Sequence, residues 1–196
     1  MHLRTLIFAT LAVSAFSLAA DDVPFQVRYA ANLNTLGDAV VDITNTGANN
    51  GGNICVNTYT FSPDEQLISC CSCLVTPNGL YSLSALNDLT VNPLTIVHPS
   101  SIVIKLLASQ PSVGSCNPSA PGTLAQGLSA WGTSVHSLPA IAGGGIYGSE
   151  TPFTSATLSA QELQRITSFC GFIQANGSGF GICNACRQGG LGADKQ

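Results

Sequence analysis

Eight cysteines constrain this chain more than any other feature of its sequence. They are Cys55, Cys70, Cys71, Cys73, Cys116, Cys170, Cys183 and Cys186. An even number of cysteines in an exported protein favours a disulfide framework, so we predict four disulfides, or three with one free pair. Side chains alternate along a strand, so Cys71 and Cys73 should face one way and Cys70 the other. We expect the three cysteines nearest the C-terminus to bridge to this cluster, with Cys55 or Cys116 completing the set.

Two other uses of the cysteines are open. Tetrahedral zinc needs four ligands, which CCSC at 70–73 and CNAC at 183–186 would supply as Cys70, Cys73, Cys183 and Cys186. The last two also form a C-x-x-C motif, which is typical of thioredoxin-like redox centres. We favour disulfides because an oxidising compartment competes for these thiols and no βα pattern surrounds 183–186. We therefore predict no metal and no cofactor.

The N-terminal segment predicts export. Residues 1–20 place Arg4 ahead of an apolar run from Leu6 to Phe16, followed by small residues, which is the pattern of a secretory signal peptide. Its removal would leave residues 21–196 as a single β-rich domain. The apolar run is shorter than the roughly 20 residues that span a bilayer, so we predict no membrane span after cleavage. The expected location is the periplasm, the cell surface or the medium.

Hydrophobic periodicity predicts a mainly β fold. Apolar and polar residues alternate with a period of two over residues 25–29 and 54–61. Further strands are predicted at 39–44, 67–75, 80–86, 101–108, 124–131, 133–138 and 153–158. Turn-forming residues separate them, and Pro77-Asn78-Gly79 joins two runs closely enough to predict a hairpin. Short strands at this spacing are typical of an antiparallel β-sandwich, or a barrel-like fold.

One helix is predicted near the C-terminus. Residues 159–162, Ser-Ala-Gln-Glu, form a capping box that satisfies free amide groups at a helix start. Gly177 stands where a left-handed residue would end the helix. Between them apolar residues recur at helical spacing, namely Leu163, Ile166, Cys170 and Ile173. We predict a helix from about 160 to 175 whose apolar stripe lies on the sandwich or closes one end of it.

Charged residues are scarce. They make up 8% of the 196 residues, against about 25% in an ordinary soluble domain. The net charge of −4 argues against nucleic acid as a partner, and the 45% hydrophobic content argues against disorder. Strand edges with little Lys or Glu lack the usual protection against edge pairing, and Lys105 is the main exception.

Candidate catalytic residues are few. Outside the signal peptide the histidines are His98 and His136, and neither lies in a recognisable catalytic motif. A Ser-His-Asp arrangement of His136 with Asp42 or Asp88 can be drawn, but two loop or strand-end histidines explain the sequence better. We therefore predict no catalytic residues.

Carboxylates for glycoside hydrolysis would come from a short set, namely Asp38, Asp42, Asp64, Glu65, Asp88, Glu150 and Glu162. Several of these lie in a turn or in the capping box. Calcium could be held by Asp42 with Asn45, or by Asn87, Asp88 and Asn92, but turn formation explains these residues as well or better.

A carbohydrate surface would need an exposed aromatic side chain. Trp131 is the candidate glycan contact, with Tyr59, Tyr81 and Tyr147 as companions, although core packing is the commoner role of such residues. Asn176-Gly177-Ser178 matches the N-glycosylation sequence, but its glycine is also the expected helix stop.

Two segments carry a family resemblance. Residues 52–80, GNICVNTYTFSPDEQLISCCSCLVTPNGL, together with the ending FGICNACRQGGLGA at 180–193, resemble exported bacterial proteins of acidobacterial type. The resemblance implies export in a bacterium. It implies no reaction, fold or ligand, so no functional residue follows from it.

These features favour a protein that is not an enzyme. We predict an exported noncatalytic β-domain, a structural, adhesive or self-assembling component of the cell surface or extracellular matrix, present as a homo-oligomer or filament. A carbohydrate-binding module using Trp131 is the first alternative. A secreted hydrolase, with His136 or His98 as the base, is the second.

Overall fold

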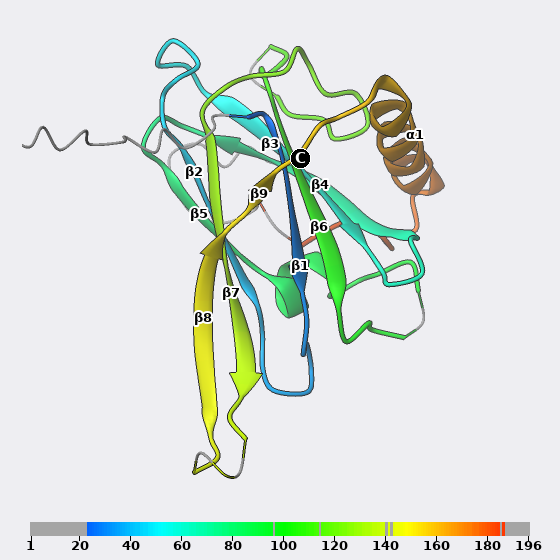
Figure 1. Ribbon diagram of the computed structural model, residues 1–196. Helices are drawn as coiled ribbons and strands as arrows, with labels where there is room; N and C mark the ends of the chain where they lie inside the picture. Colours follow the sequence, from blue (N-terminus) through cyan, green and yellow to red (C-terminus); the bar gives the residue numbers. More distant parts are fainter. Residues whose placement is uncertain are drawn as a thin grey trace, which may run out of the picture.

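The structure is a computed structural model that describes residues 23–184 and 186, except residues 96, 114, 140 and 142. The predicted signal peptide lies outside the described residues. The chain forms two antiparallel β-sheets and a C-terminal helix, as the sequence predicts (Figure 1).

The larger sheet has five strands in the order β4-β3-β6-β1-β9. Its strands are β1 (Phe25–Ala30), β3 (Ile54–Phe61), β4 (Leu67–Val75), β6 (Ile102–Ser109) and β9 (Thr154–Ser155). The smaller sheet has four strands in the order β5-β2-β7-β8. Its strands are β2 (Val40–Asn45), β5 (Leu80–Ser84), β7 (Leu128–Ser137) and β8 (Ile146–Pro152).

The main core lies between the two sheets. Alternate residues of each strand point inward, so Val56 and Ile104 of the five-stranded sheet pack in one buried cluster with Val41 and Ile43 of the four-stranded sheet. A single π-helical turn, η1 (Ala85–Leu89), follows β5 and adds Leu89 to this cluster.

The helix α1 (Ala160–Asn176) covers the outer face of the five-stranded sheet (Figure 1). Ile166, Cys170 and Ile173 of its apolar stripe are buried in a second cluster that includes Tyr59 and Phe61 of β3. Because both faces of the sheet are covered, all eight residues of β3 are buried. The burial of Ile166, Cys170 and Ile173 against this sheet confirms the predicted apolar stripe of the helix.

Both ends of α1 are capped as predicted, except that the Glu162 carboxylate pairs with Lys105 and does not complete the capping box. The Ser159 hydroxyl accepts a hydrogen bond from the Glu162 amide at 3.1 Å, and Gly177 ends the helix with φ of 63°. The Glu162 carboxylate forms an ion pair with Lys105 of β6. Lys105 therefore ties α1 to an interior strand. The sequence had suggested that it protects a sheet edge, and this expectation is wrong.

All eight cysteines are paired in disulfides: Cys55–Cys116, Cys70–Cys170, Cys71–Cys183 and Cys73–Cys186. The cysteines of the helix and of the C-terminal segment bridge to the 70–73 cluster, as predicted. Cys70 lies in the outer cluster and Cys71 and Cys73 in the inner one, so the two faces have separate partners.

This pairing does not fit the zinc alternative. Cys70, Cys73, Cys183 and Cys186 belong to three different disulfides, and Cys70 lies on the opposite face of β4 from Cys73. The four sulfurs therefore do not converge on one tetrahedral position.

Four other features differ from the sequence expectation. Pro77-Asn78-Gly79 does not close a hairpin, because β4 and β5 belong to different sheets and the turn carries the chain from one to the other. The predicted runs 124–131 and 133–138 do not form two strands: residues 128–137 form the single strand β7, and 124–127 lie in the loop before it. Strand β8 was not predicted, and β9 is much shorter than the predicted 153–158.

Candidate functional site

The β7–β8 hairpin extends beyond the body of the sandwich (Figure 1). The pairing of β7 with β8 runs from Trp131 opposite Pro152 to Ser137 opposite Ile146. At the base of this hairpin, where β1 lies beside it, the surface is hollowed into a cleft of about 610 Å³. Its walls are Val27, Arg28, Tyr29, Ser134, His136, Ser149, Thr151, Pro152, Thr154 and Ala156.

Arg28 is the charged group of this cleft. Its Nη1 donates to the Thr151 carbonyl oxygen at 2.9 Å and to the Thr151 hydroxyl, and its Nη2 donates to the Ser134 hydroxyl at 3.0 Å. The guanidinium also lies 6.0 Å from the centre of the Phe153 ring. Burial lowers the pKa of Arg28 from its usual value, because the charged form loses solvation.

Gly132 makes room for this arginine. A Cβ atom at position 132 would lie 2.2 Å from Arg28 Nε and 2.4 Å from its Cδ. The arginine side chain therefore lies directly on the backbone of β7. Any larger residue at 132 would force it to move.

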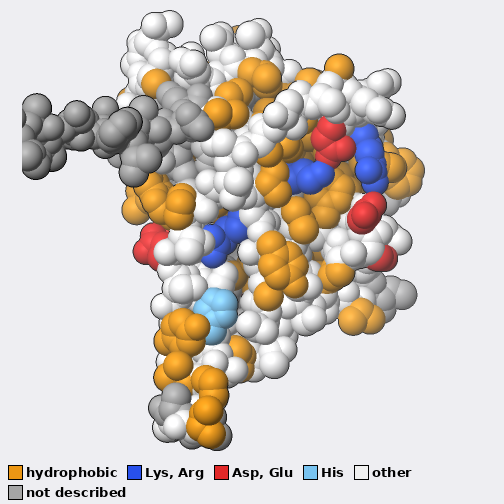
Figure 2. All heavy atoms as spheres, viewed as in Figure 1, with side chains coloured by type: hydrophobic (Ala, Val, Ile, Leu, Met, Phe, Trp, Pro, Cys, Tyr) orange, Lys and Arg blue, Asp and Glu red, His pale blue; other side chains and the backbone are white. Residues whose placement is uncertain are grey.

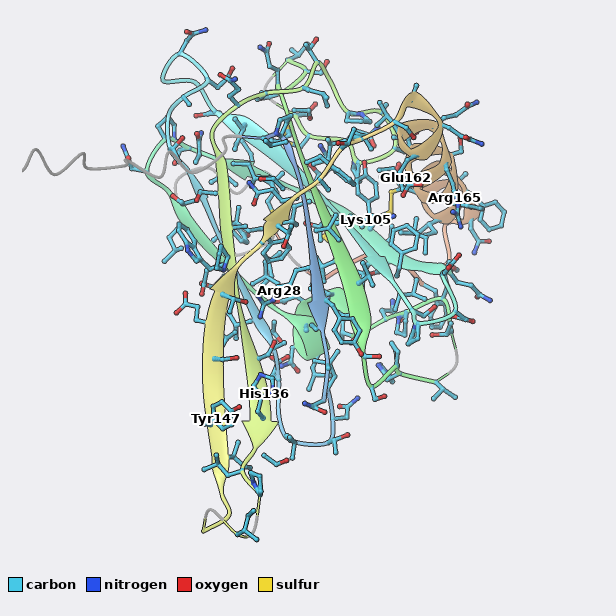
Figure 3. The ribbon with its side chains drawn as sticks, in the orientation of Figure 1. Arg28, Lys105, His136, Tyr147, Glu162 and Arg165 are labelled. Carbon is cyan, nitrogen blue, oxygen red and sulfur yellow. A yellow bond between two sulfur atoms is a disulfide. The ribbon has the colours of Figure 1, made fainter. Side chains whose placement is uncertain are left out.

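His136 lies further along the hairpin, on the same face of the molecule as Arg28 (Figure 3). Its ring stacks on Tyr147 with 5.2 Å between centroids, and its Nε2 lies 2.9 Å from the Ser149 hydroxyl. Figure 2 shows a basic side chain above a histidine on this face, surrounded mostly by hydrophobic side chains and by uncharged side-chain and backbone atoms, with an acidic side chain to its left.

The acids that the sequence suggested as partners of His136 lie elsewhere. Asp42 accepts a hydrogen bond from the Ser82 hydroxyl, on the outer face of the four-stranded sheet. Asp88 accepts from the Ser84 amide at 2.7 Å, beside η1. His136 and Ser149 therefore form a Ser–His contact that lacks an orienting carboxylate among the described residues, so the predicted triad does not form.

Trp131 lies on the outer face of the four-stranded sheet, between Asp42 and Pro152 in the register of the strands. It is half-buried. The three tyrosines do not join it: Tyr59 and Tyr81 are buried, and Tyr147 stacks on His136. The structure does not assemble the predicted aromatic set.

The remaining candidates are occupied or dispersed. Asn45 is fully buried and donates to the carbonyl oxygens of Gly52 and Val75, each at 3.0 Å, so it is a structural residue. Asn92 donates to the Gly179 carbonyl oxygen at 2.6 Å, and His98 is exposed in the loop before β6. Within the described ranges no group of three or more His, Cys, Asp or Glu could hold a metal ion.

Two more carboxylates and the sequon asparagine have local partners. Asp38 accepts from the Ser84 hydroxyl and from the Leu86 amide at 3.0 Å, and Asp64 accepts from the Ser62 hydroxyl. Asn176 is exposed and donates to the Ser178 hydroxyl at 3.0 Å. Glu65 and Glu150 are exposed.

A second hollow, of about 800 Å³, lies along α1. Phe169 and Phe172 line it with 48% and 66% of their surfaces exposed, and Asp64, Glu65 and Arg165 are its charged residues. This hollow contains no nucleophile with a matched base.

Sequence reasoning missed Arg28. The alternation at 25–29 identified a strand, but gave no sign that Arg28 on its polar face would lie between two sheets. The one available signal was Gly132, which separates the predicted runs 124–131 and 133–138, since a glycine within a strand often marks a close approach of another group.

Comparison with known proteins adds no identity: the chain matches no family model, no curated protein and no solved structure. Among the described residues, no helix is both long enough and apolar enough to cross a membrane.

Proposed function

We propose that this chain is an exported noncatalytic β-domain that assembles with copies of itself at the cell surface or in the extracellular matrix. The observation that carries the proposal is the open edge of β8 on a projecting hairpin. The export on which it depends rests on the signal-peptide pattern at residues 1–20.

The hydrogen bonding of the hairpin defines that edge. The Leu138 amide donates to the Gly145 carbonyl oxygen and the Phe153 amide to the Ala130 carbonyl oxygen, both at 2.9 Å. Hydrogen-bonded pairs alternate in an antiparallel ladder, so Tyr147, Ser149 and Thr151 direct their backbone groups toward β7. The N–H and C=O groups of Ile146, Gly148 and Glu150 then point outward, and no described residue pairs with them.

The edge of β4 differs, because other segments cover it. The Cys70 amide donates to the Gly181 carbonyl oxygen at 2.8 Å, and the Leu94 amide donates to the Ile68 carbonyl oxygen at 3.0 Å. The β8 edge carries only Glu150 as a charged side chain. It therefore lacks both common forms of edge protection, a covering segment and several charges.

The end of the hairpin is apolar as well as uncharged. No residue from 137 to 149 is Asp, Glu, Lys or Arg. Four of its hydrophobic residues are exposed, namely Leu138, Ile141, Ile146 and Tyr147. Figure 2 shows this lower end in orange and white, without acidic or basic colour below the histidine.

A second copy fits such an edge better than an unrelated partner does. Two β8 strands related by a twofold axis would pair antiparallel, so each copy satisfies the same groups of the other. The pairing would join two four-stranded sheets into one. It would also bring the apolar hairpin residues of both copies out of water.

Sedimentation velocity on the secreted mature protein tests this proposal. We expect a dimer whose fraction rises with concentration. Ile146→Lys and Gly148→Lys should each give monomers, because Lys on an edge opposes pairing. Position 148 accepts a side chain, since a Cβ there would lie 3.6 Å from Thr133 Cγ2.

Leu80→Lys is the matched control, since Leu80 is 69% exposed on β5, at the opposite edge of the same sheet. It should leave the dimer intact. A wild-type protein that stays monomeric at every concentration would exclude the proposal, and so would a dimer that both β8 variants preserve.

The two alternatives have weaker support. Carbohydrate binding at Trp131 rests on one half-buried ring, and glycan binding that disappears in Trp131→Ala would favour it. A hydrolase rests on the contact of His136 with Ser149 alone. Turnover that disappears in both His136→Ala and Ser149→Ala would favour that activity.

A further inference from the structure

We propose that the cleft between β1 and the β7–β8 hairpin binds an acidic saccharide, with the Arg28 guanidinium paired to the carboxylate of a uronate residue. The residues of this site face the cleft and not the β8 edge, so the proposal is independent of self-assembly. Four features of the described residues support it.

The first feature is a half-buried cation without a counter-charge. Of the three basic residues that the structure describes, Lys105 is paired with Glu162 and Arg165 is exposed to solvent. Arg28 is half-buried, and no carboxylate of the described residues lies within ion-pair distance of it. A charge removed from water without an opposite partner is unfavourable, so a bound anion would stabilise it.

The second feature is that the guanidinium is held in place. Thr151 accepts at Nη1 and Ser134 accepts at Nη2, while Gly132 leaves space for the side chain. Nε has no acceptor among the residues that the structure describes. Nε together with Nη2 forms the side of a guanidinium that binds a carboxylate through two parallel hydrogen bonds. This side is oriented before a ligand arrives, which lowers the entropic cost of binding.

The third feature is the chemistry of the cleft walls. Ser149 and Thr154 offer hydroxyl groups that both donate and accept, which matches the hydroxyls of a sugar. Tyr29 offers apolar ring surface, with 61% of the residue exposed, and the Tyr147 ring, 47% exposed, stacks on His136 of the cleft wall. The volume of about 610 Å³ falls within the usual range for small-ligand sites.

The fourth feature is the charge balance of the site. A uronate carries one negative charge, which one guanidinium neutralises. A phosphate carries about 1.5 to 2 negative charges at pH 7 and would be only partly neutralised here. Glu150, the acid of β8, lies one residue from Thr151 and therefore projects from the opposite face of the strand. It would not repel a carboxylate in the cleft directly.

Titration calorimetry with digalacturonate and with a glucuronate-containing disaccharide tests the proposal. We expect at least one of them to bind the wild-type protein. Its methyl ester, which keeps the ring and loses the charge, should bind about tenfold more weakly or worse, since a hydrogen bond to a charged group contributes about 1.5 to 3 kcal/mol.

Three variants locate the site. Arg28→Gln should reduce affinity about tenfold or more, and Arg28→Lys should also weaken binding because it keeps the charge but loses the two parallel donors. Gly132→Ala should weaken binding while retaining the arginine, because the new methyl group displaces it. Trp131→Ala, on the other face of the sheet, is the control that should bind normally.

Thermal unfolding of each variant separates lost binding from lost fold. Failure of both acidic disaccharides to bind, or equal affinity for acid and ester, would overturn the proposal. Tighter binding of galactose 6-sulfate would overturn the assignment to a carboxylate. Loss of binding in Trp131→Ala but not in Arg28→Gln would move the glycan site to the outer face.

Discussion

At the scale of single residues, Tyr59 links the long loop before β7 to the five-stranded sheet. Its side chain is fully buried, and its hydroxyl donates to the Pro118 carbonyl oxygen at 2.6 Å. Burial raises the pKa of Tyr59 well above its usual value, because the phenolate would lose its hydration. The folded protein therefore holds this proton more tightly than the unfolded chain does.

Stability should consequently fall at alkaline pH. The contribution of Tyr59 is complete below about pH 10, the usual pKa of tyrosine, and is lost as the pH rises toward the folded-state pKa. Tyr59→Phe should lower the free energy of unfolding by about 1 kcal/mol at neutral pH and should flatten the alkaline decline.

Urea unfolding at a series of pH values measures both effects. Tyr147→Phe, at a residue 47% exposed, is the control and should decline as the wild type does. An alkaline decline of equal size in Tyr59→Phe and wild type would contradict the assignment.

Single residues also show which features the sequence can predict and which depend on segments distant in the chain. The alternation of cysteines at 70–73 was enough to predict their two faces, because period-two geometry is local. Which face of β1 carries Arg28 into a cleft depends on the second sheet, which is distant in sequence. The hydroxyls of Thr58 and Thr60 show the same limit: they are buried without a hydrogen-bond partner among the described residues, although both positions look polar in the sequence.

At the scale of elements, local signals were sufficient for most strands and for α1. The bounds predicted for 54–61 and 67–75 are those of β3 and β4, since strongly apolar runs end at clear turn residues. Strand β8, IYGSETP, was missed because Gly, Ser, Glu and Pro weaken its pattern, and β7 alone pairs with it along its length. The supposed hairpin at Pro77-Asn78-Gly79 failed because a tight turn does not determine which sheet the next strand joins.

The attachment of α1 gives a prediction at this scale. The Cys70–Cys170 disulfide joins residues 100 apart in sequence, and Ile166 and Ile173 pack on the same sheet face. The double variant Cys70→Ser/Cys170→Ser should lose about 4 kcal/mol of unfolding free energy, because the unfolded chain gains freedom. Its helix should still form from the packed apolar stripe, but with faster amide exchange.

Hydrogen exchange of the α1 amides distinguishes this effect from general destabilisation. The control variant Cys55→Ser/Cys116→Ser removes a bridge of 61 residues that ends in the loop before β7. Its loss of unfolding free energy should be similar. The protection of the α1 amides from exchange, relative to the amides of the five-stranded sheet, should stay unchanged. Equal relative protection of α1 in the two double variants would show that the helix does not depend on Cys170.

At the scale of the whole molecule, disulfides hold the elements together where an ordinary domain would also have many charged residues. Charged residues form 8% of the chain, and Lys105–Glu162 is the one ion pair among the residues described. Three of the four disulfides end on β4 and draw α1 and the C-terminal segment onto one strand. The low charge was visible in the sequence, but its consequence at the β8 edge was not, because sheet order is a property of the complete fold.

Because three disulfides converge on β4, reduction should destabilise the fold. Cys71 and Cys73 lie in the inner core and Cys70 in the outer one, so reduction would loosen both clusters at once. Protein made in an oxidising compartment should gain about eight mass units on reduction, two hydrogens for each of four bridges, and should contain no zinc. Protein made in a reducing cytosol should unfold at lower denaturant concentration, since each bridge contributes about 2 to 4 kcal/mol. Intact mass, metal analysis and denaturant unfolding of both preparations measure this. A smaller mass gain together with stoichiometric zinc would mean that the thiolates bind metal instead of pairing.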